Sequence, residues 1–312
     1  MQQSMTLAKE LRSRADISFL TKSSETVLMM IRDAGFPALA LGNDEEIMDH
    51  LITSNPDVVV FDKIDVEERL AVEIKRHLKS RLIIFTNLTD ANKHADVAVT
   101  ADIGSQFQNV VYTDPDTNTL YYYGPKYWVL RPEFYQYKAK HKRSSGNAQH
   151  ILLMFGGSDP ADITSAALDA LLQMETVPAI DIILGAHFAH DESLTRILDR
   201  YPLKRASVTV HRNIKNVAEL MFNADLAVTS PGLSVFEALC VGTPVIVIPQ
   251  DWLQHDTYSG FMRILERDHV GKIGSMIEKR EFTYPDDKNI AQMEIGEGVP
   301  ELVELILGSS TR

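Results

Sequence analysis

Two periodicities of apolar residues alternate along almost the whole chain. Short runs rich in Val, Ile, Leu and Phe are separated by longer stretches in which apolar residues recur every three or four positions. The short runs are typical of buried strands, and the longer stretches of amphipathic helices. A chain that repeats this unit favours a mainly parallel β-sheet covered by helices on both faces. The pattern therefore predicts an α/β fold.

The first half of the chain shows this alternation after an opening helical pattern at residues 4–12. The predicted strands are residues 16–20, 38–41, 57–61, 81–85 and 96–99, and the predicted helices are residues 24–34, 44–54 and 66–79. Ser24 and Asp44 are expected to cap two of these helices. Residues 110–112 and 120–123 flank an Asp-Pro-Asp-Thr-Asn turn, which predicts a hairpin.

The opening helix is unusual for such a domain. In a doubly wound sheet the first strand normally lies mid-sheet, and the loop after it faces the ligand cleft. A helical pattern stands here where that strand is expected. We therefore expect the first domain to lack its first strand and loop. Neighbouring strands would then carry unpaired backbone groups unless another element fills the slot.

The alternation restarts after a basic, polar segment at residues 136–149. The predicted strands of the second half are residues 150–155, 179–184, 207–211, 226–229, 245–248 and 270–273, alternating with six helical stretches. The polar segment is the expected boundary. We predict a first domain at residues 1–140, a linker at 141–149 and a second domain at 150–312. The two doubly wound domains are expected to face each other across a cleft.

The composition excludes several classes of function. Lys plus Arg number 31 and Asp plus Glu 43, so the net charge is -12 and no general attraction to nucleic acid is expected. Cys240 is the only cysteine, which excludes a disulfide or a cysteine zinc site within one chain and fits a reducing cytoplasm. No apolar run reaches the ~18 residues of a membrane span. The amino terminus lacks the apolar core of a signal peptide, so we expect a cytoplasmic protein.

The most informative segment is residues 226–250, which reads as strand, small-residue turn, short helix and second strand. Ser230, Pro231 and Gly232 form the turn, so the free amides of the following helix can bind a phosphate. Glu237 lies further along that helix, where a carboxylate can hold the two hydroxyls of a ribose. The alternative places Glu237 on a solvated face, but its neighbours are apolar. Together these residues predict a nucleotide-diphosphate site.

A second candidate anion site follows the first strand of the second half, in Phe-Gly-Gly-Ser-Asp-Pro at residues 155–160. Gly156 and Gly157 allow a tight turn and a close approach of the backbone to a ligand. Ser158 or Asp159 can cap the next helix, and Pro160 suits its first turn. The alternative is a strand-to-helix turn with no ligand.

Further candidates follow other predicted strands or precede the boundary. Gln254 and His255 lie after the strand at 245–248 and could contact phosphate or sugar, with His255 as a candidate general acid or base. The alternative is a surface loop anchored by Trp252.

Arg131 and Tyr135 stand among aromatic residues that could line a sugar site or pack the hinge. Asp62 follows the strand at 57–61 and could face the cleft or cap a helix. His187 and His190 lack a third ligand in a matching pattern, so we expect a solvated loop and no metal.

These motifs together resemble the PseG and SpsG family of nucleotide-sugar enzymes, which comprises pseudaminic acid hydrolases and spore coat polysaccharide biosynthesis proteins. The family is related to MurG-type glycosyltransferases of the GT-B fold. The matching segments cover most of the chain and are residues 4–11, 57–62, 130–135, 155–160, 230–239 and the glutamine of Trp252-Leu-Gln-His. The resemblance implies a GT-B-like fold with two doubly wound domains.

The resemblance also implies roles for individual residues. The second domain would hold UDP, or occasionally CMP, and the first domain the sugar; no cofactor is implied. The residues implied on the nucleotide side are Gly156, Gly157, Ser158, Ser230, Gly232, Leu233, Ser234, Glu237 and Gln254. The residues implied on the sugar side are Asp62, Arg131 and Tyr135. Family members that are hydrolases release the sugar from UDP by attack of water.

The chain departs from the family at two places. The family histidine lies in a Gly-x-Gly-His loop that would fall just before Met1, and the family Asp-His pair is Asp62-Lys63 here. The missing histidine and the missing first strand are the same gap. We expect a polypeptide that begins further upstream or a slot filled by another element. A glycosyltransferase and a non-catalytic nucleotide-sugar-binding protein remain the alternatives to a hydrolase.

Overall fold

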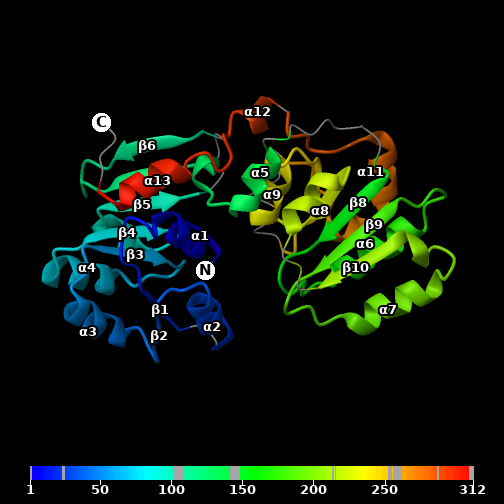
Figure 1. Cartoon of the computed structure of the whole chain (residues 1–312). Helices are drawn as coiled ribbons and strands as arrows, with labels where there is room; N and C mark the ends of the chain where they lie inside the picture. The colour runs from blue at the N-terminus through cyan, green and yellow to red at the C-terminus, as the bar shows by residue number, and fades with distance from the viewer. Residues whose placement is uncertain are drawn as a thin grey trace. The chain divides into compact units, whose positions relative to one another are not determined.

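The computed structural model forms two compact units (Figure 1). It describes residues 2–22, 25–101, 108–138, 140, 148–212, 214, 216–251, 255, 262–286 and 288–308. Unit 1 comprises Met1–Arg131 and Met293–Arg312, and unit 2 comprises Pro132–Gln292. Each unit is an α/β sandwich built on its own mainly parallel sheet, as the apolar periodicity predicts.

The described strands of unit 1 form two separate sheets. The larger has the order β3-β4-β5-β7-β6, in which only the β6–β7 pair is antiparallel. Its strands are β3 (Val58–Asp62), β4 (Arg81–Phe85), β5 (Val97–Thr100), β6 (Val110–Thr113) and β7 (Leu120–Tyr123). The smaller sheet pairs β1 (Phe19–Thr21) with β2 (Ala38–Ala40) in parallel. No described strand of the smaller sheet pairs with a strand of the larger one.

Helices cover both faces of the larger sheet. On one face, α1 (Gln2–Leu11) and α13 (Val299–Ile306) bury their apolar sides against Ile83, Phe85 and Val97. On the other, α3 (Glu45–Ser54) and α4 (Glu68–His77) pack against Leu82 and Ile84. Successive side chains of β4 thus pack into the hydrophobic cores on opposite faces of the sheet, because side chains alternate along a strand. The remaining described helices of this unit are α2 (Glu25–Asp33) and the 3-10 turns η1 (Asp90–His94) and η2 (Pro125–Tyr127).

Asp44 is not the side-chain cap that the sequence predicts. It stands at the position before α3, but its carboxylate makes no capping bond and instead pairs with Lys22 at 2.8 Å and Lys63 at 2.9 Å. The oxygen Oδ1 of Asn43 accepts from the Glu46 amide at 3.1 Å in its place. The Asp44 carboxylate forms these ion pairs instead of a capping bond, because two ammonium groups reach it and charge-assisted bonds are the stronger ones. Ser24, the other expected cap, lies outside the described residues.

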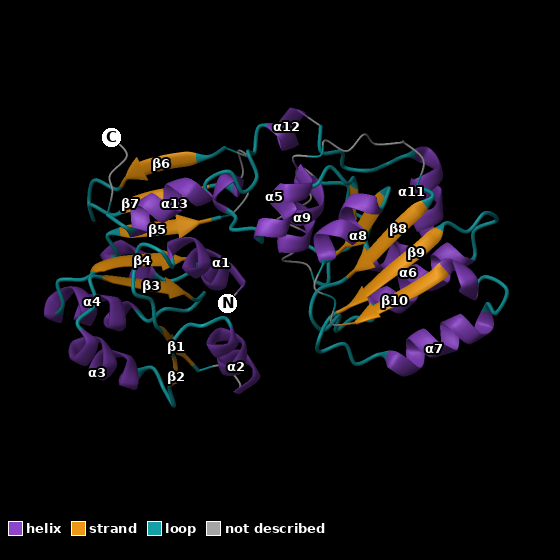
Figure 2. Ribbon diagram, viewed as in Figure 1, coloured by secondary structure: helices purple, strands orange, loops and turns teal. Residues whose placement is uncertain are grey.

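Unit 2 contains one parallel sheet among its described strands, with the order β10-β9-β8-β11-β12. Figure 2 labels three of these strands, β8, β9 and β10. The strands are β8 (His150–Met154), β9 (Ala179–Leu184), β10 (Val208–Arg212), β11 (Leu226–Thr229) and β12 (Val245–Val247). One face is covered by α6 (Ile163–Leu172), α7 (Asp191–Arg200) and α11 (Ile273–Lys279). Contacts on β8, β11 and β12 come also from α8 (Val217–Asn223) and α9 (Leu233–Cys240).

The strand predicted at residues 270–273 is wrong. This segment spans the 3-10 helix η4 (Arg267–Lys272) and the start of α11, and both Val270 and Ile273 are buried. Their spacing of three residues places them on one side of a helical turn. A short apolar run carries too few positions to separate this pattern from a strand.

The domain boundaries also differ from the predicted 1–140, 141–149 and 150–312. Unit 2 begins at Pro132, because α5 (Pro132–Lys138) packs against α8 and α9. The chain returns to unit 1 at Met293, after α12 (Lys288–Ala291). Figure 1 shows α13, in red, lying on the strands of unit 1. Its apolar face is buried there, so the last described helix completes the first unit. Residues 141–147 of the predicted linker lie outside the described residues.

Candidate functional site

Three loops of unit 2 leave neighbouring strands at one edge of the sheet. They follow β8, β11 and β12, which are adjacent and parallel, so their carboxyl ends lie side by side. In open α/β sheets this edge is where ligands bind. The loops contain Gly156–Gly157, Ser230–Gly232 and Gln250 respectively.

The Gly156–Gly157 loop is oriented by the turn after β9. A Cβ atom added at Gly185 would lie 2.4 Å from the Gly156 carbonyl oxygen and 2.3 Å from that of Gly157, and the His187 amide donates to the latter at 2.9 Å. Both carbonyls thus face residues 185–187. Because a trans peptide is planar with N–H opposite C=O, the amides of Gly157 and Ser158 point the other way. Successive amides turned to one side form an anion-binding concavity.

The space above the two glycines is open. No heavy atom lies within 4 Å of a Cβ built at Gly156 or Gly157, and both residues and Ser158 are exposed. Gly156 has φ +77°, a left-handed conformation that favours glycine. The loop therefore presents backbone that a ligand can approach closely.

The carboxylate of Asp159, which follows this loop, caps the first amides of α6, although Asp162 is the residue before the helix. Asp159 is 2% exposed, and its two carboxylate oxygens accept from the amides of Ile163 at 3.0 Å and Thr164 at 2.8 Å. The prediction that Ser158 or Asp159 caps this helix is confirmed for Asp159. The helix begins three residues after Pro160, so Pro160 lies in the turn and not in the first helical turn. The α6 amides are occupied, and the amides oriented for an anion are those of the glycine loop.

The second loop begins α9. Gly232, with φ +141°, is the residue before the helix, and nothing lies within 4 Å of its Cβ position. Leu233 and Ser234 form the half-buried first turn. The amides at a helix start carry partial positive charge, so an anion is stabilised there. This loop has the same open space at a glycine as the loop after β8.

Gln250 connects the loops. Its amide nitrogen Nε2 donates to Oδ1 of Asp159 at 3.2 Å and to Oγ of Ser230 at 3.0 Å. The backbone carbonyl oxygen of Gln250 accepts from Nη1 of Arg267 at 3.4 Å. The sequence analysis did not select Gln250 as a site residue. The sequence does contain one signal that could have identified Gln250. Like Gly156 and Ser230, it follows the carboxyl end of a strand of this sheet.

Glu237 is buried within α9, with 4% of its surface exposed. The alternative that placed it on a solvated face is therefore wrong. A buried carboxylate is stable only when it is hydrogen bonded or paired, so a residue of this type inside an apolar helix has a specific partner or ligand. Its Cα lies about 6 Å along the helix axis from that of Leu233, because a helix rises about 1.5 Å per residue.

The remaining nucleotide-side candidates are only partly described. Oε1 of Glu266 lies 2.8 Å from Nε2 of His255, which holds the imidazole in place. Gln254 and Trp252 lie outside the described residues.

The sugar-side candidates do not share one unit. In unit 1 the Asp62 carboxylate at the end of β3 accepts from the Ser4 hydroxyl and from Nε2 of Gln3, the latter at 3.2 Å. The neighbouring Lys63 binds Asp44, and the hydrogen bond from Lys22, together with Lys63, lowers the pKa of the Asp44 carboxyl. Arg131 ends unit 1, whereas Tyr135 lies on α5 in unit 2. Tyr135 thus falls outside the unit to which the sequence assigned it.

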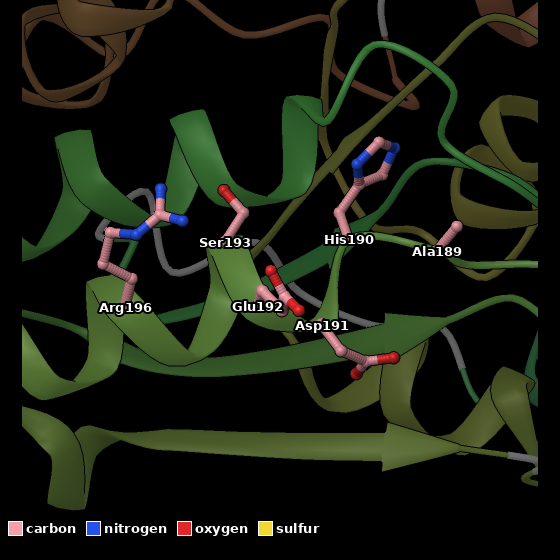
Figure 3. Close-up of a pocket in the computed structure, with 6 residues that line it drawn as sticks. All are labelled: Ala189, His190, Asp191, Glu192, Ser193 and Arg196. Carbon is pink, nitrogen blue, oxygen red and sulfur yellow. The ribbon is translucent and has the colours of Figure 1, made fainter.

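A surface hollow of about 430 Å³ lies at the start of α7 (Figure 3). Its lining residues are Ala189, His190, Asp191, Glu192, Ser193 and Arg196. Asp191 is paired with Arg212 of β10. Its two carboxylates, Asp191 and Glu192, outnumber the single guanidinium of Arg196 in the lining, and a net negative charge opposes a phosphate. The hollow is therefore a poorer candidate than the three loops for an anionic ligand.

Two other kinds of site are absent from the described residues. No group of three or more His, Cys, Asp or Glu side chains is arranged there to hold a metal ion. No described helix combines the length and the apolar character needed to cross a membrane.

Comparison with known proteins gives relatives at the level of sequence. The chain is 37% identical over 307 residues to an uncharacterized protein of Methanocaldococcus jannaschii, a match that covers 97% of this chain and 62% of that protein. It is 26% identical over 254 residues to the spore coat polysaccharide biosynthesis protein SpsG of Bacillus subtilis, covering 80% of this chain and 72% of SpsG. The chain thus spans less than two thirds of the first relative's length. No protein-family model matches.

Solved structures establish the fold class. MurG of Acinetobacter baumannii superposes with a TM-score of 0.64 at 16% identity, over 98% of this chain and 95% of MurG. HepE of Anabaena, solved in complex with UDP-glucose, superposes with a TM-score of 0.58 at 13% identity, over 99% of this chain and 95% of HepE. The fold is therefore the GT-B fold of glycosyltransferases, with two parallel-sheet domains. In sequence the chain is similar to SpsG, the kind of relative that the sequence motifs predict.

Proposed function

We propose that the chain binds a nucleotide-sugar, with UDP as the nucleotide, and acts in the synthesis of a surface polysaccharide or a nonulosonic acid in the cytoplasm. The observation that carries this proposal is the orientation of the Gly156–Gly157 loop, whose carbonyls face Gly185 and His187 so that its amides point away from them, while the Cβ positions of both glycines are open. The names of two similar proteins support it, because HepE was solved with UDP-glucose and SpsG acts in polysaccharide biosynthesis.

Each nucleotide-side residue has a role in this proposal. The amides of Gly157 and Ser158 bind one phosphate, and the amides at the start of α9, at Leu233 and Ser234, bind the other. Glu237 accepts hydrogen bonds from the ribose hydroxyls. Gln254 contacts phosphate or sugar, a role that rests on the family resemblance.

The proposed reaction is hydrolysis of the bond between sugar and nucleotide. Water attacks the anomeric carbon, the bond from that carbon to the diphosphate oxygen breaks, and UDP leaves. His255, held by Glu266 at 2.8 Å, is the candidate general acid or base among the described residues. In unit 1, Asp62 is the candidate contact to the sugar, and Arg131 and Tyr135 are the further sugar-side candidates.

Binding is tested by titrating the protein with UDP in a calorimeter and comparing two glycine variants. A methyl group at Gly157 meets no atom within 4 Å, so Gly157→Ala should fold with unchanged stability. If a phosphate occupies that space, the variant should bind UDP about tenfold or more weakly, since one charged hydrogen bond contributes about 1.5–3 kcal/mol. Gly271→Ala is the matched control, because Gly271 also has nothing within 4 Å. Equal UDP affinity of both variants and the wild type would remove the glycine loop from the site.

Turnover separates hydrolysis from its alternatives. Release of UDP from a UDP-sugar without any added acceptor indicates a hydrolase. Release only when an acceptor alcohol is added indicates a glycosyltransferase, which the GT-B fold favours as the second candidate. Binding with no release under either condition indicates a non-catalytic nucleotide-sugar-binding protein.

A further inference from the structure

We propose that Gln250 is a positioning residue that holds the two glycine-bearing loops at the spacing a diphosphate requires. The proposal rests on the nucleotide-binding function proposed above and concerns how that site is assembled. Gln250 is not among the residues to which the family resemblance gives a role.

The first observation is the pair of bonds made by a single side-chain nitrogen. Nε2 of Gln250 donates to Asp159 Oδ1 at 3.2 Å and to Ser230 Oγ at 3.0 Å. Asp159 follows directly on the Gly156–Gly157 loop, and Ser230 begins the loop that leads to Gly232. One amide group therefore connects both loops across positions separated by 91 and 20 residues in the chain.

The second observation is that each end of this bridge is buried. Asp159 is 2% exposed and fixed by the first two amides of α6, and Ser230 is 7% exposed. Gln250 itself follows β12, and Arg267 donates to its carbonyl at 3.4 Å. Because each partner belongs to a different loop, the Gln250 side chain ties the two loops together, and less freedom is lost when a ligand binds.

The chemistry of the bridge explains why an amide is needed. An amide NH₂ group has two donors, so it can bond a carboxylate and a hydroxyl at once. A glutamate would place a second carboxylate against Asp159, and like charges at that distance repel. An apolar side chain of the same length would leave the buried Asp159 and Ser230 oxygens short of a donor.

The consequence for the ligand is specific to a diphosphate. A monophosphate can bind at one loop, so its affinity depends little on how far apart the loops stand. A diphosphate must engage both loops, so its affinity depends on their spacing. Loss of the bridge should therefore reduce the preference for UDP over UMP more than it reduces nucleotide binding in general.

The test compares UDP and UMP binding by calorimetry in the full chain and in Gln250→Met, which keeps the length and removes both bonds. We expect UDP affinity to fall about tenfold, with a smaller change for UMP, as for the loss of about one hydrogen bond. Gln173→Met is the matched control, because Gln173 also donates to an aspartate, Asp169 at 2.8 Å, but on the exposed end of α6. It should bind both nucleotides as the wild type does.

A second variant and a ligand-free measurement guard against a simple loss of structure. Gln250→Glu keeps size and polarity, and should bind UDP at least as weakly as Gln250→Met. Amide exchange without nucleotide should rise in Gln250→Met at residues 156–158 and at 232–234 together, and in neither segment of Gln173→Met.

Four outcomes overturn the proposal. Unchanged UDP affinity, or equal losses for UDP and UMP, contradicts a positioning role for Gln250 while leaving nucleotide binding intact. A wild-type protein that binds neither UDP nor UMP overturns the proposed function itself, and this role with it. Exchange that rises in only one loop shows that Gln250 does not couple them.

Discussion

At the scale of single residues, the structure separates side chains that shape the candidate site from those that could touch a ligand. Asp159 accepts from the Ile163 amide, and Gln250 donates to Asp159, so both side chains stabilise the loops by bonding to other protein groups. Gly157 and Gly232 present open space. Glu237 belongs to neither group by its local chemistry, because it is a carboxylate with 4% exposure on an otherwise apolar helix.

Glu237 is predicted to contribute to nucleotide affinity. Replacing it in Glu237→Gln keeps the volume but removes the charge, and UDP binding should weaken by about tenfold, as expected for a charged hydrogen bond of about 1.5–3 kcal/mol. Titration calorimetry measures this. Glu278→Gln, on the exposed side of α11, is the control. A folded Glu237→Gln protein that binds UDP like the control would take Glu237 out of the ribose site.

At the scale of elements, a carboxylate stabilises the open edge of the unit 2 sheet. Asp181 of β9 lies between His150 of β8 and His211 of β10, with Nε2 of the two rings at 2.5 Å and 2.6 Å from its oxygens. The side chain of Asp181 is 13% exposed. The three strands are neighbours, so this cluster links β10, the edge strand of the described sheet, to its centre.

Asp181→Ala should therefore lower the free energy of unfolding by about 1–3 kcal/mol, because two imidazoles lose a partly buried acceptor. Urea denaturation followed by circular dichroism measures the change. Asp199→Ala is the comparison, since Asp199 pairs with Arg205 at an exposed position, where such a pair contributes at most about 1 kcal/mol. Equal effects of the two substitutions would mean that Asp181 does not hold the edge strand.

Prediction from sequence succeeded at this scale where the signal was local. The hairpin of β6 and β7 was predicted from its Asp-Pro-Asp-Thr-Asn turn, in which Oδ1 of Asp114 accepts from the amides of Asp116 and Thr117. The Asp159 cap was predicted from its place before a helix. The strand at 270–273 was wrong because Val270 and Ile273 fit a helical turn equally well.

Long-range contacts were not predictable in the same way. The Gln250 bridge depends on β8, β11 and β12 being neighbours, and no pattern near residue 250 encodes that order. For α13, the apolar face shows that the helix packs on something, but only the fold shows that its partner is β4 and β5 of unit 1. Tertiary contacts, and not local propensity, determine both the Gln250 bridge and the packing partner of α13.

At the scale of the whole molecule, the chain leaves unit 1 at Arg131, forms unit 2 and returns at Met293. The returning segment supplies Leu302, Leu305 and Ile306 to the same core as Leu7 and Leu11 of α1. Lys126 reinforces it through an ion pair with Glu301 at 3.4 Å, and the Gly298 amide donates to the Lys126 carbonyl at 2.9 Å. The two ends of the described chain thus share one core.

Leu302→Ala should destabilise unit 1 selectively. Leu302 is fully buried, and removing such a side chain lowers the free energy of unfolding by about 2–5 kcal/mol. Amide exchange should rise in β4 and β5, with β8 and β11 unchanged. Leu203→Ala is the control, because Leu203 is 97% exposed. Faster exchange throughout both units would contradict independent cores.

The return of the chain bears on how the protein is made. A ribosome delivers residues in order, so the 161 positions of unit 2, Pro132–Gln292, emerge before α13 does. Unit 2 can then finish folding before unit 1, whose apolar surface stays exposed until α13 has been synthesised. Nascent chains stalled shortly before residue 293 would be the species most in need of a chaperone.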